Sequence, residues 1–579
     1  MIAQLSTLIL AAALGQVPAE SGWLDSVPAE ADVVLRVRGL GAAKGDLLVM
    51  LKAMSPALAA KAEPVLEQVI TEAKAQAGEQ VLAAPFLVLL RGVPSDEPGS
   101  VPYALVVKSA DYEAVLKSVA GGKDPGTKRL GKGYDSFNGP GGKTWYAAKG
   151  DGTVAFGGDR TLIGGFTKPG ATALGKTTSP NLREKFLAGD AGIYVNVNAL
   201  AARYKDSIAK AEQGFFAAFD QLGPQLGSGM TGFFKSFYGG LFASIKEADR
   251  FALSVDFGGE GLGMSALLTV KGGSKAAKMI AEARTGDAAR LAKLSADSSF
   301  YGYLNTDAEL FRSLWMMSLQ MLTHGGKVSP ELEGAIAKER GRIESVSTMT
   351  FDNGIKSFQL TDLADPRSFA EAYSGMVKLM KDADSPLNFM KEIVSTPAAE
   401  TYRGFTFTRI EMTVDLDKFA KLQPGNPNAA AAMKAMYGGD KVTTWMGVGP
   451  TQLIQVVAAS WADARSQIDG YFAGGQSIGS TAGFRSTRAQ LPKEASFVGM
   501  MSAQGLVRQL VAQISILSPQ APKLPPGDMP GELALIGFSL SPSAPSGIEF
   551  QMFVPATVGP VFEKGLEPVF SAWRPPVKP

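Results

Sequence analysis

The chain has 579 residues, of which 45% are hydrophobic and 19% are charged, so it can bury several cores and is not disordered. Its 57 lysines and arginines nearly balance 55 acidic residues, which excludes the strongly basic charge of a general nucleic-acid-binding protein. The absence of cysteine excludes disulfides, thiol nucleophiles, a lipid anchor on cysteine and cysteine-ligated metals.

Residues 1–19 have the pattern of a secretory signal peptide. An apolar run from Leu5 to Leu14 precedes small residues, and we expect cleavage after Gly15 or Ala19. No lysine or arginine precedes the run, which departs from the usual pattern. The run is too short to span a bilayer, and no later stretch has the ~20 apolar residues that a membrane helix needs. We therefore expect a periplasmic or extracellular protein whose mature form has no transmembrane span.

Four stretches of the chain begin in the same way. Each has an apolar residue, a polar turn with an acidic residue in fourth place, and then an alternating run. Because side chains alternate between the faces of a strand, the residues in seventh place should all point into a core. The stretches are VPAEADVVLRVRGL from Val27, LAGDAGIYVNVNAL from Leu187, LSADSSFYGYLNTD from Leu294 and LPKEASFVGMMSAQ from Leu491, with Val33, Ile193, Phe300 and Phe497 in seventh place.

The pattern after each opening strand also recurs. A helical stripe follows, clearest over 310–321 and 506–517. A hairpin comes next, and Asn353-Gly354 predicts a two-residue turn in the third repeat, with counterparts at 86–108, 250–271 and 532–554. A second helix closes the repeat, and its predicted N-caps are Ser109, Ser274 and, before Pro366, Asp365.

These patterns predict an α+β fold of tandem strand-helix-strand-strand-helix repeats, with mainly antiparallel sheets and helices packed on one face. We expect a long repeat at 20–185, a short one at 186–290, a long one at 291–480 and a short one at 481–579. The long repeats carry extensions in which Thr144-Trp145 matches Thr444-Trp445. Residues 26–290 and 291–579 are therefore predicted to be two copies of one two-repeat module.

The segments PAEADVVLRVRGL, PYALVVKSADYEAVLKSV and LAGDAGIYVNVNALAARYKDSI resemble an uncharacterised family of exported, signal-peptide-bearing bacterial repeat proteins of the type abundant in planctomycete-like genomes. The resemblance covers most of the chain after the signal peptide. It implies export and the fold class, and it implies no activity.

Two strings look catalytic. GQSIG around Ser477 matches a nucleophile elbow, but it follows a helical pattern, and the chain's single histidine, His324, lies upstream of it. Ser207 and Lys210 have the S-x-x-K spacing without the elements that accompany it in known enzymes. One histidine disfavours a zinc site, and no phosphate loop or dinucleotide fingerprint is present. We therefore predict no catalytic, cofactor-binding or metal-binding residues, with carboxylate-only catalysis left open.

A phenylalanine-rich segment from Gly214 interleaves aromatic and small residues. Such a segment either lines a groove for an apolar ligand or fills a core between two helices. Its phenylalanines are Phe215, Phe216, Phe219, Phe233, Phe234 and Phe237.

The export signal, the repeats and the missing catalytic sets predict a non-enzymatic envelope protein that binds or scaffolds an unknown partner. The first alternative is a carrier of apolar small molecules or lipid that uses the phenylalanine-rich segment. The second is a serine hydrolase centred on Ser477.

Overall fold

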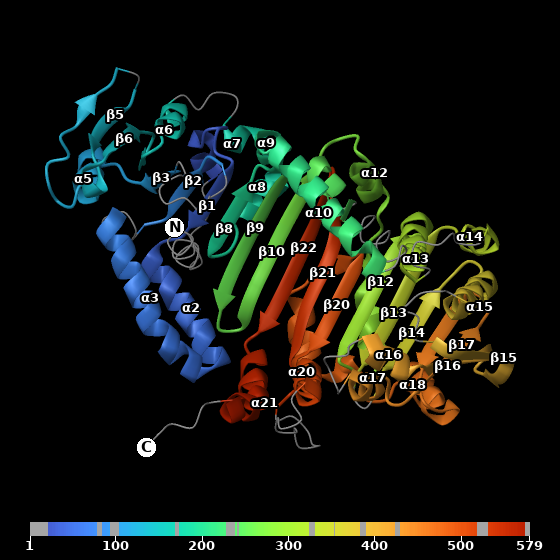
Figure 1. Cartoon of the computed structure of the whole chain (residues 1–579). Coiled ribbons are helices and arrows are strands. Elements are labelled where there is room, and N and C mark those ends of the chain that lie inside the picture. The colour runs from blue at the N-terminus through green and yellow to red at the C-terminus, as the bar shows by residue number, and fades with distance from the viewer. Residues whose placement is uncertain are drawn as a thin grey trace. The chain divides into compact units, whose positions relative to one another are not determined.

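The computed structural model describes residues 21–77, 84–92, 103–131, 133–167, 173–226, 238–239, 242–322, 330–351, 354–382, 390–422, 429–517 and 531–573. The chain forms two compact units, each assembled from separate segments (Figure 1). Unit 1 consists of residues 1–208, 244–277 and 545–557, and unit 2 consists of residues 209–243, 278–544 and 558–579.

The sheet of unit 1 is antiparallel throughout, in the order β4-β5-β6-β7-β3-β2-β1-β8-β9-β10-β22. Figure 1 shows β8, β9, β10 and β22 side by side. The strands are β1 (Val33–Val37), β2 (Phe86–Leu90), β3 (Tyr103–Lys108), β4 (Lys128–Arg129), β5 (Asp135–Asn138), β6 (Thr144–Lys149), β7 (Thr153–Gly157), β8 (Ala191–Val195), β9 (Ala248–Gly258), β10 (Gly261–Val270) and β22 (Gly547–Pro555).

Helices cover both faces of the unit 1 sheet. Phe86, Val88 and Leu90 of β2 lie in one core, whereas Leu87 and Leu89 lie in another. The first core includes side chains of α2 (Leu40–Met54), α3 (Pro56–Ala77) and α5 (Tyr112–Val119), and the second includes side chains of η1 (Ser21–Ser26), α6 (Arg160–Phe166), α7 (Leu174–Thr177) and α8 (Pro180–Leu187). The remaining helices that begin in unit 1 are η2 (Pro140–Gly142), α9 (Val197–Arg203), α10 (Lys205–Leu226) and α12 (Lys275–Glu282).

The sheet of unit 2 is also antiparallel, in the order β21-β20-β12-β13-β14-β18-β17-β16-β15. A separate short pair joins β11 (Gly286–Asp287) to β19 (Glu494–Ala495). The strands of the main sheet are β12 (Phe300–Asp307), β13 (Arg342–Thr350), β14 (Lys356–Asp362), β15 (Met390–Tyr402), β16 (Phe405–Val414), β17 (Lys441–Val448), β18 (Gln452–Val457), β20 (Phe497–Ser502) and β21 (Leu535–Ser543).

Helices cover both faces of this sheet as well. One core packs the sheet against η3 (Ala288–Lys293), α18 (Trp461–Ala473), η4 (Ile478–Ser480) and α19 (Ala482–Ala489). The other packs it against α13 (Ala308–Leu322), α14 (Pro330–Ile336) and α15 (Pro366–Asp382). Further helices among the described residues of unit 2 are α16 (Leu416–Leu422), α17 (Ala429–Tyr437), α20 (Ala503–Leu517) and α21 (Val558–Trp573).

The mixed α and β composition and the antiparallel pairing are confirmed. All four opening strands form, as β1, β8, β12 and β20, and the hairpins at 86–108 and 250–271 form as β2–β3 and β9–β10. The predicted caps Ser274 and Asp365 accept backbone hydrogen bonds at the starts of α12 and α15. Among the helices that the structure describes, none is long and apolar enough to cross a membrane.

Three predictions are wrong. Helices lie on both faces because central strands such as β2, FLVLL, are apolar on both sides and need cover on both. The β13–β14 register pairs Thr350 with Lys356, which leaves an odd number of residues between the strands and excludes a two-residue turn. Asp111 caps α5 in place of Ser109, because the helix begins only at Tyr112.

Candidate functional site

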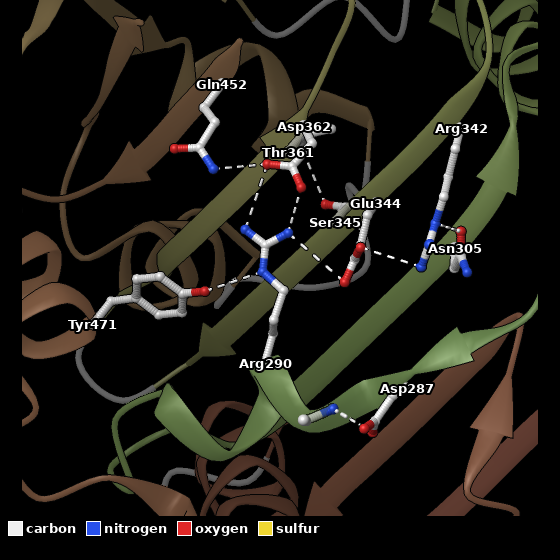
Figure 2. Close-up of polar contacts among 11 residues, drawn as sticks. Asp287, Arg290, Asn305, Arg342, Glu344, Ser345, Thr361, Asp362, Gln452 and Tyr471 are labelled. Atoms are coloured by element: carbon white, nitrogen blue, oxygen red, sulfur yellow. Dashed lines mark hydrogen bonds and ion pairs between the residues drawn. The ribbon is translucent and has the colours of Figure 1, made fainter.

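A row of polar side chains crosses four neighbouring strands of unit 2 (Figure 2). Asn305 on β12 lies opposite Glu344 on β13, Glu344 lies opposite Asp362 on β14, and Asp362 lies opposite Gln452 on β18. Because side chains on one face of a strand recur every second residue, the adjacent row on the same face lies two residues away on each strand. That row belongs to the buried core and consists of Tyr303, Val346, Leu360 and Ile454.

Arg290 of η3 neutralises the centre of the polar row. Its Nη1 lies 2.5 Å from Asp362 Oδ2 and 3.7 Å from Glu344 Oε1. Its Nε donates a hydrogen bond to Tyr471 Oη at 3.3 Å. Burial lowers the pKa of Arg290, but the hydrogen bonds with Asp362 and Tyr471 outweigh burial and hold this pKa above its usual value. Arg290 therefore stays cationic and joins η3 to the sheet and to α18.

Arg342 stands at one end of the polar row. Its Nε donates to Asn305 Oδ1 at 2.8 Å, and its Nη2 lies 3.3 Å from Glu344 Oε2. Asn305 is fully buried, and its Nδ2 has no hydrogen-bond partner among the described residues. Burial raises the pKa of Tyr303, whose hydroxyl lies nearby without a hydrogen bond of good geometry. A Cβ at Gly286 would collide with Tyr303 Oη, Asn305 Nδ2 and Arg342 Nη2, so any larger residue there would force these side chains to move.

Arg342 also lines a pocket of about 550 Å³. The pocket lies where β12 ends and β13 begins, because Asp307 is paired with Arg342 in the sheet. We call it the arginine pocket after its charged lining. This lining consists of Arg284, Arg312, Arg340 and Arg342 together with the carboxylates Asp307, Glu309 and Glu339.

Two of these carboxylates are bound to the backbone. Glu339 is fully buried and accepts hydrogen bonds from the N–H groups of Ala364 at 2.9 Å and Asp365 at 3.2 Å, just before α15. Asp307 Oδ1 accepts the N–H groups of the first turn of α13, at 2.7 and 2.9 Å. The Asp307 contacts cap α13, whereas Glu339 binds the two residues that lead into α15. These carboxylates therefore hold the ends of α13 and α15 at the pocket.

Three of the pocket's arginines have no carboxylate partner in the described part of the chain. Arg312 Nε donates to the carbonyl of its own helix at Ala308, at 3.2 Å, and Arg340 Nη1 donates to the carbonyl of Glu339 at 3.0 Å. Arg284 is exposed at the rim. Of the four pocket arginines, only Arg342 forms an ion pair with a described residue. Its partner, Glu344, belongs to the polar row.

This arrangement can bind an anion. Guanidinium groups are permanent cations with several N–H donors, and they match the oxygens of phosphate or carboxylate groups. They do not transfer protons in the usual pH range, so their contribution is recognition. Within the described residues, no group of three or more His, Cys, Asp or Glu side chains could hold a metal ion.

The residues singled out in the sequence lie elsewhere. Ser477 precedes η4 and follows α18 and the left-handed Gly474, so no strand leads into it as an elbow requires. Ser207 and Lys210 are exposed on α10. His324 lies outside the described residues.

Part of the phenylalanine-rich segment is described. Phe215 and Phe216 pack against each other and against Phe242, with ring centroids 6.2 to 6.3 Å apart, and Phe215 also packs against Tyr238 at 4.4 Å. The side chain of Phe219 and residues Phe233, Phe234 and Phe237 lie outside the described residues. The predicted apolar groove therefore stays a prediction.

Comparisons of the chain with protein-family models, with curated proteins and with solved structures found no match. The resemblance to exported bacterial repeat proteins stays a prediction. Function must therefore be argued from the geometry of the site.

Sequence reasoning missed the arginine pocket. One local signal was available, because Arg340, Gly341 and Arg342 follow the buried Glu339 in the string KERGR. Arg284 precedes β11 and Arg312 lies on α13, and tertiary packing brings both to the same pocket as Arg340 and Arg342.

Proposed function

We propose that the protein is an exported, non-enzymatic binding protein whose unit 2 holds an oxyanion-bearing ligand in the arginine pocket. One observation carries the proposal: Arg284, Arg312 and Arg340 line one pocket with no carboxylate partner among the described residues, while Asp307 and Glu339 are bound to the backbone. A phosphate or carboxylate group would supply the missing acceptors. The ligand class is therefore a small molecule or polymer that carries such a group.

Calorimetric titration with inorganic phosphate and with succinate tests this function. The wild-type protein should bind at least one of the two saturably, and raising the ionic strength from about 0.05 to about 0.5 M should weaken binding because charges are screened. The double variant Arg284→Met/Arg312→Met keeps much of each aliphatic stem and should lose about a hundredfold or more in affinity, since each of the two charged hydrogen bonds contributes about 1.5–3 kcal/mol.

The matched control is Arg129→Met/Arg465→Met, which removes two exposed arginines outside the pocket. This control should bind as the wild type does. The proposal fails if neither anion binds the wild-type protein saturably, or if the control variant loses as much affinity as the pocket variant.

The apolar carrier remains the alternative function. The packing of Phe215 and Phe216 with Tyr238 and Phe242 fits a small core as well as one wall of a groove. Copurified lipid, or saturable binding of an apolar fluorescent probe that Phe215→Ser/Phe216→Ser abolishes in a folded protein, would favour the carrier. A hydrolase centred on Ser477 would require esterase activity that Ser477→Ala removes.

The duplicated module is also a proposal. The strand order β6-β7-β3-β2-β1-β8-β9 in unit 1 parallels β17-β18-β14-β13-β12-β20-β21 in unit 2, which supports it. In this correspondence β6, which carries Trp145, matches β17, which carries Trp445. An experimental structure whose superposed modules place these two tryptophans on unrelated elements would contradict the duplication.

A further inference from the structure

The two faces of the unit 2 sheet differ in the size of their side chains. The face toward η3 and α18 carries large core residues. On the opposite face, toward α13 and α15, the register aligns two rows of mostly glycine, hydroxyl and carboxamide side chains on β12, β13, β14 and β18, with a leucine at each end of the second row. One row is Gly302, Ser347, Gln359 and Gln455, and the next is Leu304, Ser345, Thr361 and Leu453.

A pocket of about 300 Å³ lies between these rows and the two helices. Phe311 and Trp315 of α13 and Phe369 and Tyr373 of α15 form a continuous aromatic wall. The Trp315 ring stacks on Phe369 at 5.1 Å and on Tyr373 at 6.3 Å, and Phe311 lies 5.7 Å from Phe369. We call this cavity the aromatic pocket. Its size is at the small end of the range for ligand sites, which suits a molecule of one or two rings.

Several polar atoms at the aromatic pocket have no hydrogen-bond partner among the described residues, although the two glutamine side chains form other hydrogen bonds. Gln359 Nε2 donates to two hydroxyl groups of the sheet at 3.1 and 3.2 Å, and Gln455 Nε2 donates to Tyr373 Oη at 3.3 Å. The two carboxamide oxygens accept no hydrogen bond from any described residue. Trp315 Nε1 is buried without a partner there, and the Tyr373 hydroxyl keeps its own hydrogen to donate.

The pocket's lining is also uncharged. The aromatic lining favours a planar ring, because aromatic rings pair in offset-stacked or edge-to-face arrangements. Two free acceptors and two free donors favour a ring that carries both N–H groups and a carbonyl or ring-nitrogen acceptor, and such an acceptor would pair the buried Trp315 Nε1. A charged ligand would find no counter-charge in the lining.

We propose that the aromatic pocket binds a planar, uncharged nitrogen heterocycle of one or two rings. The ring stacks on the aromatic wall, donates hydrogen bonds to the oxygens of Gln359 and Gln455, and accepts one from Trp315 Nε1 or the Tyr373 hydroxyl. This site is separate from the arginine pocket in its lining residues, and it does not depend on the function proposed for that pocket.

Calorimetry on the full-length protein tests the proposal with uracil and adenine as probes and with glucose as a neutral, non-planar comparison. At least one heterocycle should bind saturably, and glucose should not. Gln359→Leu and Gln455→Leu should each weaken binding about tenfold, because each removes one hydrogen bond to the ligand. The heterocycle should also quench tryptophan fluorescence in the wild type, and Trp315→Phe should remove that signal and weaken binding while preserving the ring stack.

Gln467→Leu is the control, since Gln467 lies on α18 and does not line the aromatic pocket. It should bind as the wild type does, and circular dichroism should show each variant folded. The proposal is overturned if neither heterocycle binds, if glucose binds in their place, or if folded Gln359→Leu and Gln455→Leu variants bind with wild-type affinity.

Discussion

Replacing Arg290 by methionine tests whether the polar row is held together by charge. The substitution leaves Glu344 and Asp362 directly opposite each other, and like charges in that position destabilise a sheet. Their side chains are 18% and 36% exposed, so the cost lies between that of a surface pair and that of a buried one. Losing a partner costs under about 1 kcal/mol at the surface and about 3–5 kcal/mol when buried, so we expect a loss of about 2 kcal/mol. Arg342 and Gln452 still contact the two carboxylates and keep the loss from reaching the upper limit.

Urea unfolding followed by near-ultraviolet circular dichroism measures this loss. The denaturant dependence rises with protein size, so for unit 2 it should be at least about 3 kcal/mol per molar, and the midpoint of its transition should fall by up to about 0.7 M without a change of slope. Neutralising both acids in Arg290→Met/Glu344→Gln/Asp362→Asn should restore at least half of the lost stability. A triple variant no more stable than Arg290→Met would show that the loss comes from packing of the arginine stem, and the electrostatic reasoning would be wrong.

Three further outcomes are expected. Gly286→Ala should cost about 1–3 kcal/mol of stability through overpacking, whereas Gly470→Ala, which meets no atom within 4 Å, should be neutral or stabilising in urea unfolding. The side-chain hydrogen bond from Ser368 and its backbone N–H hold the pKa of Asp365 below its usual value. The stabilisation by Asp365 is therefore complete above about pH 4 and is lost as pH falls through the folded-state pKa. Ser368→Ala should weaken this dependence of the unfolding free energy on acid pH. An unchanged dependence would contradict the role given to Ser368. Mature protein from the native host should begin at Gln16 or Glu20 by mass spectrometry, and an intact Met1 would exclude the signal peptide.

Local patterns in the sequence predicted the four opening strands, the hairpins β2–β3 and β9–β10, and the start of α15. The alternation after Phe300 and Phe497 gives β12 and β20, and the Asp365-Pro366 pair marks the start of α15 within one residue. These signals depend only on residues that are close in the sequence, so they can be read without knowledge of the tertiary structure. The two-faced burial of β2 was visible in its five consecutive apolar residues, but an antiparallel hairpin led to the expectation of one solvated face.

The candidate sites could not be predicted in the same way. Asn305, Glu344, Asp362 and Gln452 are separated by tens of residues, and their alignment follows from three strand registers. A one-residue slip in any register would move a side chain to the other face of the sheet, and the four polar side chains would no longer be aligned. The alternation of each strand was readable, but which strands become neighbours was not, because β18 joins β14 across the intervening β15–β17 segment.

The two glutamines of the aromatic pocket, Gln359 and Gln455, predict a conflict between ligand binding and protein stability. Gln359 and Gln455 lie beneath aromatic helices, where leucine would bury more apolar surface and leave no carboxamide oxygen without a partner. The hydroxyls that Gln359 contacts, on Ser345 and Thr361, already bond to each other at 2.9 Å, so they stay paired without it. The double variant Gln359→Leu/Gln455→Leu also removes the hydrogen bond from Gln455 to Tyr373 Oη, which offsets part of the apolar gain. It should therefore unfold within about 1 kcal/mol of the wild type while losing heterocycle binding. A loss of stability above about 1 kcal/mol would mean that the carboxamides are structural, and the expected conflict between binding and stability would not exist.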